Sequence, residues 1–109
     1  MHYFKLGAIA LATSFAALAS QTAAAAETLR LAHGLAENHP VHLAMVKFAE
    51  LTKQKSNGEL EVKIFANGTL GGERETLEQV QNGVLEMTKA SASPLETFAP
   101  EYKVFNLPF

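Results

Sequence analysis

Four side chains able to bind a metal ion lie close together in one short segment of the chain. His33, Glu37, His39 and His42 supply three imidazoles and one carboxylate, and such donors suit zinc. Pro40 constrains the backbone between His39 and His42, and the chain contains no cysteine. The sequence has no fourth strong ligand and no cysteine spacing typical of a zinc site. A metal-binding module built on His33, His39 and His42 is therefore an alternative interpretation and not the principal one.

Three other polar residues stand at positions where a ligand could meet them. Glu73 follows Gly71-Gly72 at the start of a predicted helix, where a carboxylate offsets the helix dipole. Ser91 carries a small hydroxyl that suits a ligand oxygen, or it is simply a small strand residue. Asn38 either caps the helix that begins at Pro40 or closes over a ligand. These residue types favour binding over bond-making chemistry.

Sequence motifs of the common enzyme classes are absent. There is no cysteine nucleophile and no Gly-x-Ser-x-Gly turn. The segment Leu70-Gly71-Gly72-Glu73 has two glycines but lacks the Gly-Lys-Ser/Thr that completes a phosphate-binding loop. We therefore expect that the protein is not an enzyme and that it uses no cofactor.

Hydrophobic periodicity indicates the elements that position these side chains. Leu60, Val62 and Ile64 alternate with charged residues, which is the period of a strand. Val41, Ala44, Phe48 and Leu51 recur at helical spacing and predict the apolar stripe of a helix, just as Leu77, Val80 and Val84 do for a second helix. The predicted elements are a strand at 28–33, a helix that begins at Pro40 with Asn38 or His39 as cap and closes at Asn57-Gly58, a strand at 60–65, a helix at 73–82 stopped by Gly83, a strand at 86–91 ended by Ser93-Pro94, a loop or short helix at 96–102 and a possible fourth strand at 104–109.

The alternation of strands and helices predicts an α/β fold, β-α-β-α-β with a mainly parallel sheet. With the first strand in the centre, the two helices lie on opposite faces of the sheet. Ligands of open α/β sheets bind at the carboxyl ends of the strands, where the strand order reverses. His33, Glu73 and Ser91 all fall near that edge.

The first 26 residues have the three parts of a secretory signal peptide. A positively charged opening precedes the apolar run from Leu6 to Leu18, and Ala24-Ala25-Ala26 forms a small-residue cleavage site. The run of about 13 residues is shorter than a membrane-spanning helix requires, so export is favoured over an uncleaved anchor. Residues 27–109 carry eight basic and eleven acidic residues, a net charge of −3, which gives no basic field for nucleic acid.

In these features the chain resembles the extracytoplasmic solute-binding proteins of TRAP transporters, of the DctP type. The likeness extends from about Thr28 to Phe109. Each piece is short, but their order and spacing together are specific. The residues that carry it are Leu29 to His33, Phe48 to Leu51, Gly58 before Val62 to Phe65, Leu70 to Arg74, Gln79 to Gly83, and Val104 to Phe109.

The resemblance implies a periplasmic receptor for a small organic acid such as a dicarboxylate. Such a receptor closes by a hinge and delivers its ligand to a permease with a small and a large membrane subunit, driven by an ion gradient. It implies no cofactor, no nucleic-acid partner and no membrane span after signal cleavage. The substrate-binding residues expected on this basis are His33, Glu37, Asn38, His39, Glu73 and Ser91. A receptor of an ATP-driven importer, which shares the architecture, is the other alternative.

The resemblance also implies that residues 27–109 form the truncated N-terminal part of one lobe, lobe I, of a periplasmic-binding-protein-like fold. In the family an arginine binds the ligand carboxylate through two parallel hydrogen bonds. That arginine lies in the part of the family that follows residue 109, and neither Arg30 nor Arg74 matches it. We therefore expect no tight ligand binding by this chain alone.

Overall fold

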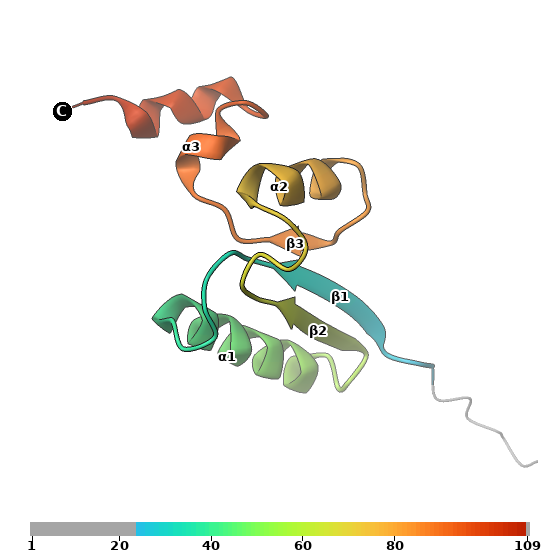
Figure 1. Cartoon of the computed structure of the whole chain (residues 1–109). Coiled ribbons are helices and arrows are strands. Elements are labelled where there is room, and N and C mark those ends of the chain that lie inside the picture. Colours follow the sequence, from blue (N-terminus) through green and yellow to red (C-terminus); the bar gives the residue numbers. More distant parts are fainter. Residues whose placement is uncertain (1–23, 109) are drawn as a thin grey trace, which may run out of the picture.

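The computed structural model describes residues 24–108, so the predicted signal peptide lies almost entirely outside the described residues. The sheet has three strands, and Figure 1 shows it with a helix on either side and a short helical tail. The elements in chain order are β1 (Glu27–Ala32), α1 (Pro40–Lys55), β2 (Leu60–Phe65), α2 (Glu73–Gln81), β3 (Met87–Thr88), α3 (Ala92–Leu95) and the 3-10 helix η1 (Pro100–Asn106).

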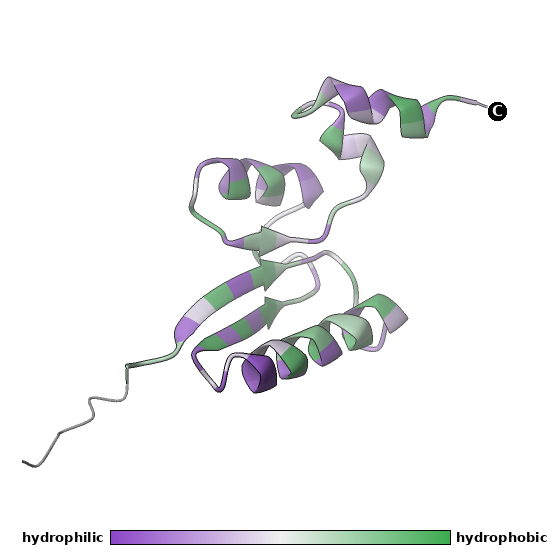
Figure 2. Ribbon diagram, turned by 180° about the vertical axis from the view of Figure 1, so that it is seen from behind, coloured by the Kyte–Doolittle hydropathy of each residue, from purple (hydrophilic) through white to green (hydrophobic). Residues whose placement is uncertain are grey.

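All three strands are parallel, and β1 lies between the other two in the order β2-β1-β3. Leu31 at the centre pairs with Ile64 on one side and with Met87 on the other. Apolar and polar residues alternate along β1 and β2 (Figure 2), and Leu31 and Val62 are buried. The predicted α/β class, the parallel pairing and the central place of the first strand are confirmed.

Both ends of α1 are where the sequence places them. His39 is the N-cap, and its Nδ1 accepts a hydrogen bond from the Val41 N–H at 3.1 Å. Asn57 and Gly58 follow the helix with φ of 53° and 80°, the left-handed geometry of a helix stop.

Among the described residues, no helix is long and apolar enough to cross a membrane.

The apolar stripe predicted for α1 does not face the sheet. Phe48 is 45% exposed and Leu51 is 38% exposed, whereas the less exposed side of the helix carries His42, Met45 and Ala49. Both sets recur at helical spacing, so periodicity does not choose between them. The apolar residues of α1 are spread over a wide arc of the helix surface, and the sheet covers only one side of that arc. The predicted stripe lies on the other side.

The second helix ends earlier than its predicted apolar stripe. α2 stops at Gln81, and Gly83 follows with φ of 71°, so the predicted terminator is confirmed. Val84 therefore lies beyond the helix and is 55% exposed, while its neighbour Leu85 is buried. The place of Val84 in the helical stripe was wrong because the chain had already turned back toward the sheet.

The third strand and the C-terminal segment differ most from the sequence-based expectation. β3 spans two residues and not 86–91, and Ser93-Pro94 lies inside α3. The fourth strand expected at 104–109 is wrong within the described residues, because residues through Asn106 form η1. Pro94 and Pro100 stand at or near helix starts, where a missing backbone donor costs nothing, and η1 packs against α3.

On the β3 side of the sheet, strand pairing reaches only Leu31 and Ala32 of β1. The carboxylate of Glu86 accepts hydrogen bonds beside the earlier part of β1 instead. Glu86 Oε2 accepts the backbone N–H of Arg30 at 2.7 Å and its Nε–H at 2.9 Å, and Oε1 lies 2.7 Å from the guanidinium. The guanidinium also donates to the Val84 carbonyl. The hydrogen bonds from Arg30 lower the pKa of the Glu86 carboxyl from 4.5 to about 2, and the side-chain hydrogen bond is the largest cause.

We predict that Gly71→Ala destabilises the fold and displaces the start of α2. Gly71 has a φ of 114°, and an added Cβ would clash with Glu75 Oε2 and approach Glu75 Cβ to 3.0 Å. Strained backbone of this kind costs roughly 1–3 kcal/mol, measurable as a loss of unfolding free energy in urea. Gly34→Ala is the matched control, because nothing lies within 4 Å of its added Cβ. Equal stability of the two variants would contradict this account.

The Arg30–Glu86 pair predicts acid sensitivity of the sheet. Because the folded-state pKa of Glu86 is lowered, the pair's stabilisation is complete above pH 4.5 and is lost as pH falls toward about 2. Glu86→Gln should therefore lower the thermal midpoint at neutral pH and flatten its decline in acid. Glu78→Gln removes only a surface pair with Arg74 and should leave the profile unchanged. A profile of Glu86→Gln identical to the parent's would refute the prediction.

Candidate functional site

The loops after β1 and β2 are hydrogen-bonded to each other at the carboxyl edge of the sheet. The His33 N–H donates to the Phe65 carbonyl at 3.0 Å, and the Gly68 N–H donates to the His33 carbonyl at 3.0 Å. The Asn67 N–H reaches the Leu35 carbonyl at 2.9 Å. Asn67 and Gly68 have positive φ, which lets the second loop turn back over the first. This edge is therefore a defined backbone platform.

His33 is held rigidly in that platform, only 2% exposed. Its Nδ1 accepts the Leu35 N–H at 3.0 Å, so its proton is on Nε2, which lies 2.9 Å from Nδ1 of His42. Burial, followed by the nearby charges of His42, Lys89 and His39, lowers the pKa of His33 from 6.5. The His33–His42 hydrogen bond thus joins the end of β1 to the first turn of α1.

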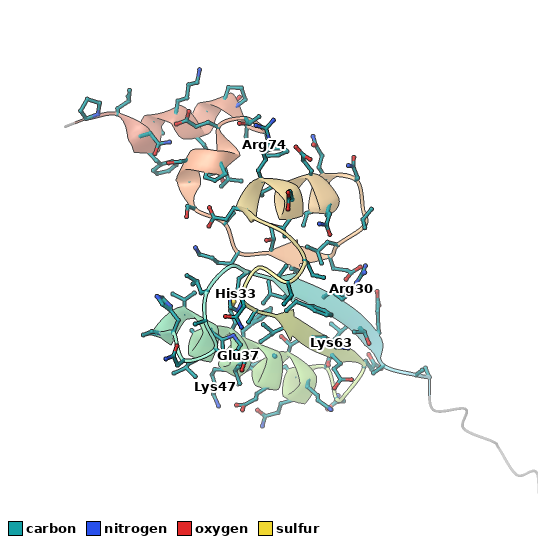
Figure 3. All side chains as sticks on the ribbon, viewed as in Figure 1. Arg30, His33, Glu37, Lys47, Lys63 and Arg74 are labelled. Carbon is teal, nitrogen blue, oxygen red and sulfur yellow. The ribbon has the colours of Figure 1, made fainter. Side chains whose placement is uncertain are left out.

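The other predicted residues of this loop face solvent. Glu37, Asn38 and His39 are exposed, and the His39 N–H closes a turn onto the Ala36 carbonyl at 3.0 Å. Figure 3 shows Glu37 beside α1, on the same side of the sheet as the loop after His33. His39 acts as the helix cap, and no side-chain hydrogen bond of Glu37 or Asn38 occurs within the described residues.

Glu73 and Ser91 are brought together across the same edge. Glu73 Oε1 accepts the Ser91 N–H at 3.1 Å and the Ser91 hydroxyl at 2.9 Å. Burial raises the pKa of the Glu73 carboxyl, but hydrogen bonds from Ser91 and Lys89 outweigh it, so the net shift is downward. Glu73 is therefore ionised near neutral pH, and its position at the start of α2 favours that charge.

Lys89 completes this group and was missed by the sequence-based list. Its Nζ lies 3.3 Å from Glu73 Oε1. Its backbone N–H donates to the Ala32 carbonyl at 3.0 Å, so it continues the pairing of β3 beside the end of β1. Lys89 lies inside the strand predicted at 86–91, where a basic residue is typical of ordinary surface charge, so no signal in the sequence indicated its contact with Glu73.

Two hydroxyls beneath the group connect α2 to the sheet. Thr76 is buried at 2% exposure, and its Oγ1 lies 2.9 Å from Oγ1 of Thr88. The Thr88 hydroxyl is in turn 3.1 Å from the Ala32 carbonyl. This chain of contacts holds the start of α2, and hence Glu73, against the ends of β1 and β3.

Neither the alternative metal site nor the hollow elsewhere on the sheet is a better candidate for the functional site than this edge. Nδ1 of His39 is used as a helix cap and His33 is bonded to His42, and residues 24–108 contain no group of three or more acidic, His or Cys side chains arranged for a metal. A hollow of about 470 Å³ runs along the sheet, lined by Thr28, Glu61, Val62 and Lys63. It does not reach the carboxyl edge and gathers no side chains from the loops.

The lowered pKa of His33 predicts that folding weakens in mild acid. Because the folded state favours the neutral imidazole, stability is complete above pH 6.5 and declines as pH falls from there toward the lower folded-state pKa. Urea unfolding at about pH 7.5 and about pH 5.5 measures the loss. His33→Asn should reduce this difference, whereas His39→Gln, at an exposed position, should keep it. An unchanged difference in His33→Asn would contradict the role of the pair.

Comparison with known proteins places the chain in a family. The family model for DctP, described as bacterial extracellular solute-binding protein, family 7, matches residues 31–109. The C4-dicarboxylate-binding protein DctB of Bacillus subtilis is 39% identical over 80 residues, 73% of this chain and 23% of that protein. The family consists of solute-binding proteins and not of enzymes, as expected from the sequence.

Solved structures of the same kind share the fold. The sugar acid binding protein DctPAm of Advenella mimigardefordensis, in complex with galactonate, has a TM-score of 0.73 and 36% identity over 77% of this chain and 27% of its own. A TRAP periplasmic solute binding protein of Pseudomonas putida F1 with bound D-glucuronate has a TM-score of 0.74 and 34% identity over 76% of this chain and 27% of its own. The chain thus spans about a quarter of the length of these relatives. It belongs to the DctP family of bacterial extracellular solute-binding proteins.

Proposed function

We propose that the protein contributes to the ligand site of a TRAP-type solute receptor that captures a small organic acid. The observation that carries the proposal is the meeting of Glu73, Ser91 and the loop after His33 at one edge of a parallel sheet. This is the edge where α/β sheets bind ligands. An organic acid as the ligand is supported by the C4-dicarboxylate-binding relative and by the structural relatives with bound galactonate and D-glucuronate.

The proposed site residues divide into two groups by their surroundings. Glu73 and Ser91 present polar atoms at the edge and contact the ligand directly. Glu37, Asn38 and His39 are exposed in the loop and close over it from the side of α1. His33 has both ring nitrogens engaged, which supports a positioning role for this residue beneath the loop.

The remaining parts of the proposal follow from family membership. Residues 1–26 are a signal peptide that directs the protein to the periplasm, and residues 27–109 form part of lobe I. The ligand is enclosed when two lobes close about a hinge. It is then handed to an ion-gradient-driven permease with a small and a large membrane subunit. The structural relatives that are TRAP periplasmic solute binding proteins favour this permease over an ATP-driven importer.

Ligand titration followed by NMR tests the proposal. The chain labelled with ¹⁵N and titrated with D-galactonate or succinate should show weak, saturable shifts of the amides of His33, Glu73 and Ser91. Ser91→Ala should weaken binding roughly 2-fold to 10-fold, the effect of one neutral hydrogen bond. Ser93→Ala is the matched control, because the Ser93 hydroxyl contacts Asn106 in the C-terminal segment.

Two results would contradict the proposal. One is the absence of saturable shifts with either acid in a chain that gives a dispersed, folded spectrum. The other is binding confined to the hollow beside Thr28 and Lys63, which would move the ligand away from the carboxyl edge.

A further inference from the structure

β2 is an outer strand of the sheet, and within the described residues no strand lies beside its far edge (Figure 1). The carbonyls of Glu59 and Phe65 accept backbone hydrogen bonds from the β1 side at 2.8 Å and 3.0 Å. Successive residues of a strand direct their backbone groups to opposite sides. Leu60, Val62 and Ile64 therefore direct their N–H and C=O groups away from β1, toward the free edge of β2.

One of these three residues already has a partner at the free edge. Ser56 Oγ lies 3.0 Å from the Leu60 nitrogen and 3.4 Å from the Leu60 carbonyl oxygen. No hydrogen bond from residues 24–108 reaches the outward backbone groups of Val62 or Ile64. A row of unpaired backbone groups is a template for a further strand. The free edge can therefore accept a strand centred on Val62.

Two opposite charges flank Val62 along this strand. Glu61 and Lys63 point to the same face of the sheet, because side chains alternate, and both line the hollow described above. Lys63 has no ion pair within the described residues, and its Nζ lies 5.4 Å from the centroid of the Phe65 ring. Glu61 lies 3.3 Å from Lys53, but both side chains are more than half exposed, and such a pair contributes little. Both charges are thus available to a second chain.

The order of these charges is complementary to itself when the strand is reversed. In an antiparallel pair with Val62 opposite Val62 of a second copy, each Glu61 lies opposite the Lys63 of the other copy. A parallel pair in register would place each charge opposite its own kind, and like charges directly opposite are destabilising. The charge pattern therefore favours a second copy of this chain, paired antiparallel about a two-fold axis.

The helix on this side of the sheet leaves room for the pair. α1 is bonded to the end of β1 through His33 and His42, and to the start of β2 through Ser56, so it lies across these two strands. Neighbouring helices pack about 8–10 Å apart, which is roughly two strand spacings of about 4.8 Å. Two copies of α1 therefore fit side by side over the four central strands of a joined sheet.

We propose that β2 pairs antiparallel with β2 of a second copy and joins two three-stranded sheets into one sheet of six strands. Val62 exchanges two backbone hydrogen bonds with Val62 of the second copy, and each Ile64 N–H donates to the Leu60 carbonyl of the other copy. The contact is one strand wide, so the dimer is weak and depends on concentration. It lies on the side of the sheet and does not depend on the proposed function.

Charge reversal followed by sedimentation equilibrium tests the inference. The parent chain should dimerise as its concentration rises. Glu61→Lys and Lys63→Glu each place like charges opposite each other twice in the dimer, so each should raise the dissociation constant about 10-fold. An equal mixture of the two variants should form a heterodimer about as tight as the parent dimer, because every opposing pair again has opposite signs.

Arg74→Glu and Glu78→Lys are the matched controls, since they reverse the same charges in an exposed pair on α2. They should dimerise like the parent, and the amide spectrum of each variant establishes that it is folded. Hydrogen exchange locates the contact, because the Val62 and Ile64 amides should become protected as concentration rises. A parent chain that stays monomeric up to about 1 mM, single variants that dimerise like the parent, or a mixture without heterodimer would each overturn the inference.

Discussion

The parallel pairing of β1 with both β2 and β3 is the constraint on which the rest of the structure depends. Because neighbouring parallel strands run in one direction, the chain leaves all three at the same edge of the sheet. The loops that follow β1 and β2 are thereby close enough to exchange backbone hydrogen bonds. The residues after β3 reach the start of α2, and the polar groups of the site come from segments far apart in the sequence.

The polar side chains at that edge are held in place by hydrogen bonds and remain accessible to a ligand. Thr76 and Thr88 connect α2 to the sheet below the surface, and Ser91 and Lys89 hold one oxygen of Glu73. His33 and His42 hold the loop on the other side. His33 and Thr76 are buried, and these contacts satisfy polar atoms that burial would otherwise penalise.

Local signals in the sequence predicted the parts of the structure that local physics decides. The alternation in β2, the cap at His39 and the glycine stops at Gly58 and Gly83 depend on neighbours in the chain, and all are confirmed. The face of α1 that meets the sheet, the length of β3 and the helical form of residues 100–106 depend on tertiary partners. The position of Glu73 was predicted, but its pairing with Lys89 joins two elements whose contact the sequence does not reveal.

A crystal structure of the chain grown with D-galactonate tests the central claim most directly. The account predicts three parallel strands in the order β2-β1-β3, with galactonate at their carboxyl ends against Glu73 and Ser91. An antiparallel arrangement of these strands, or galactonate bound away from their carboxyl ends, would contradict it.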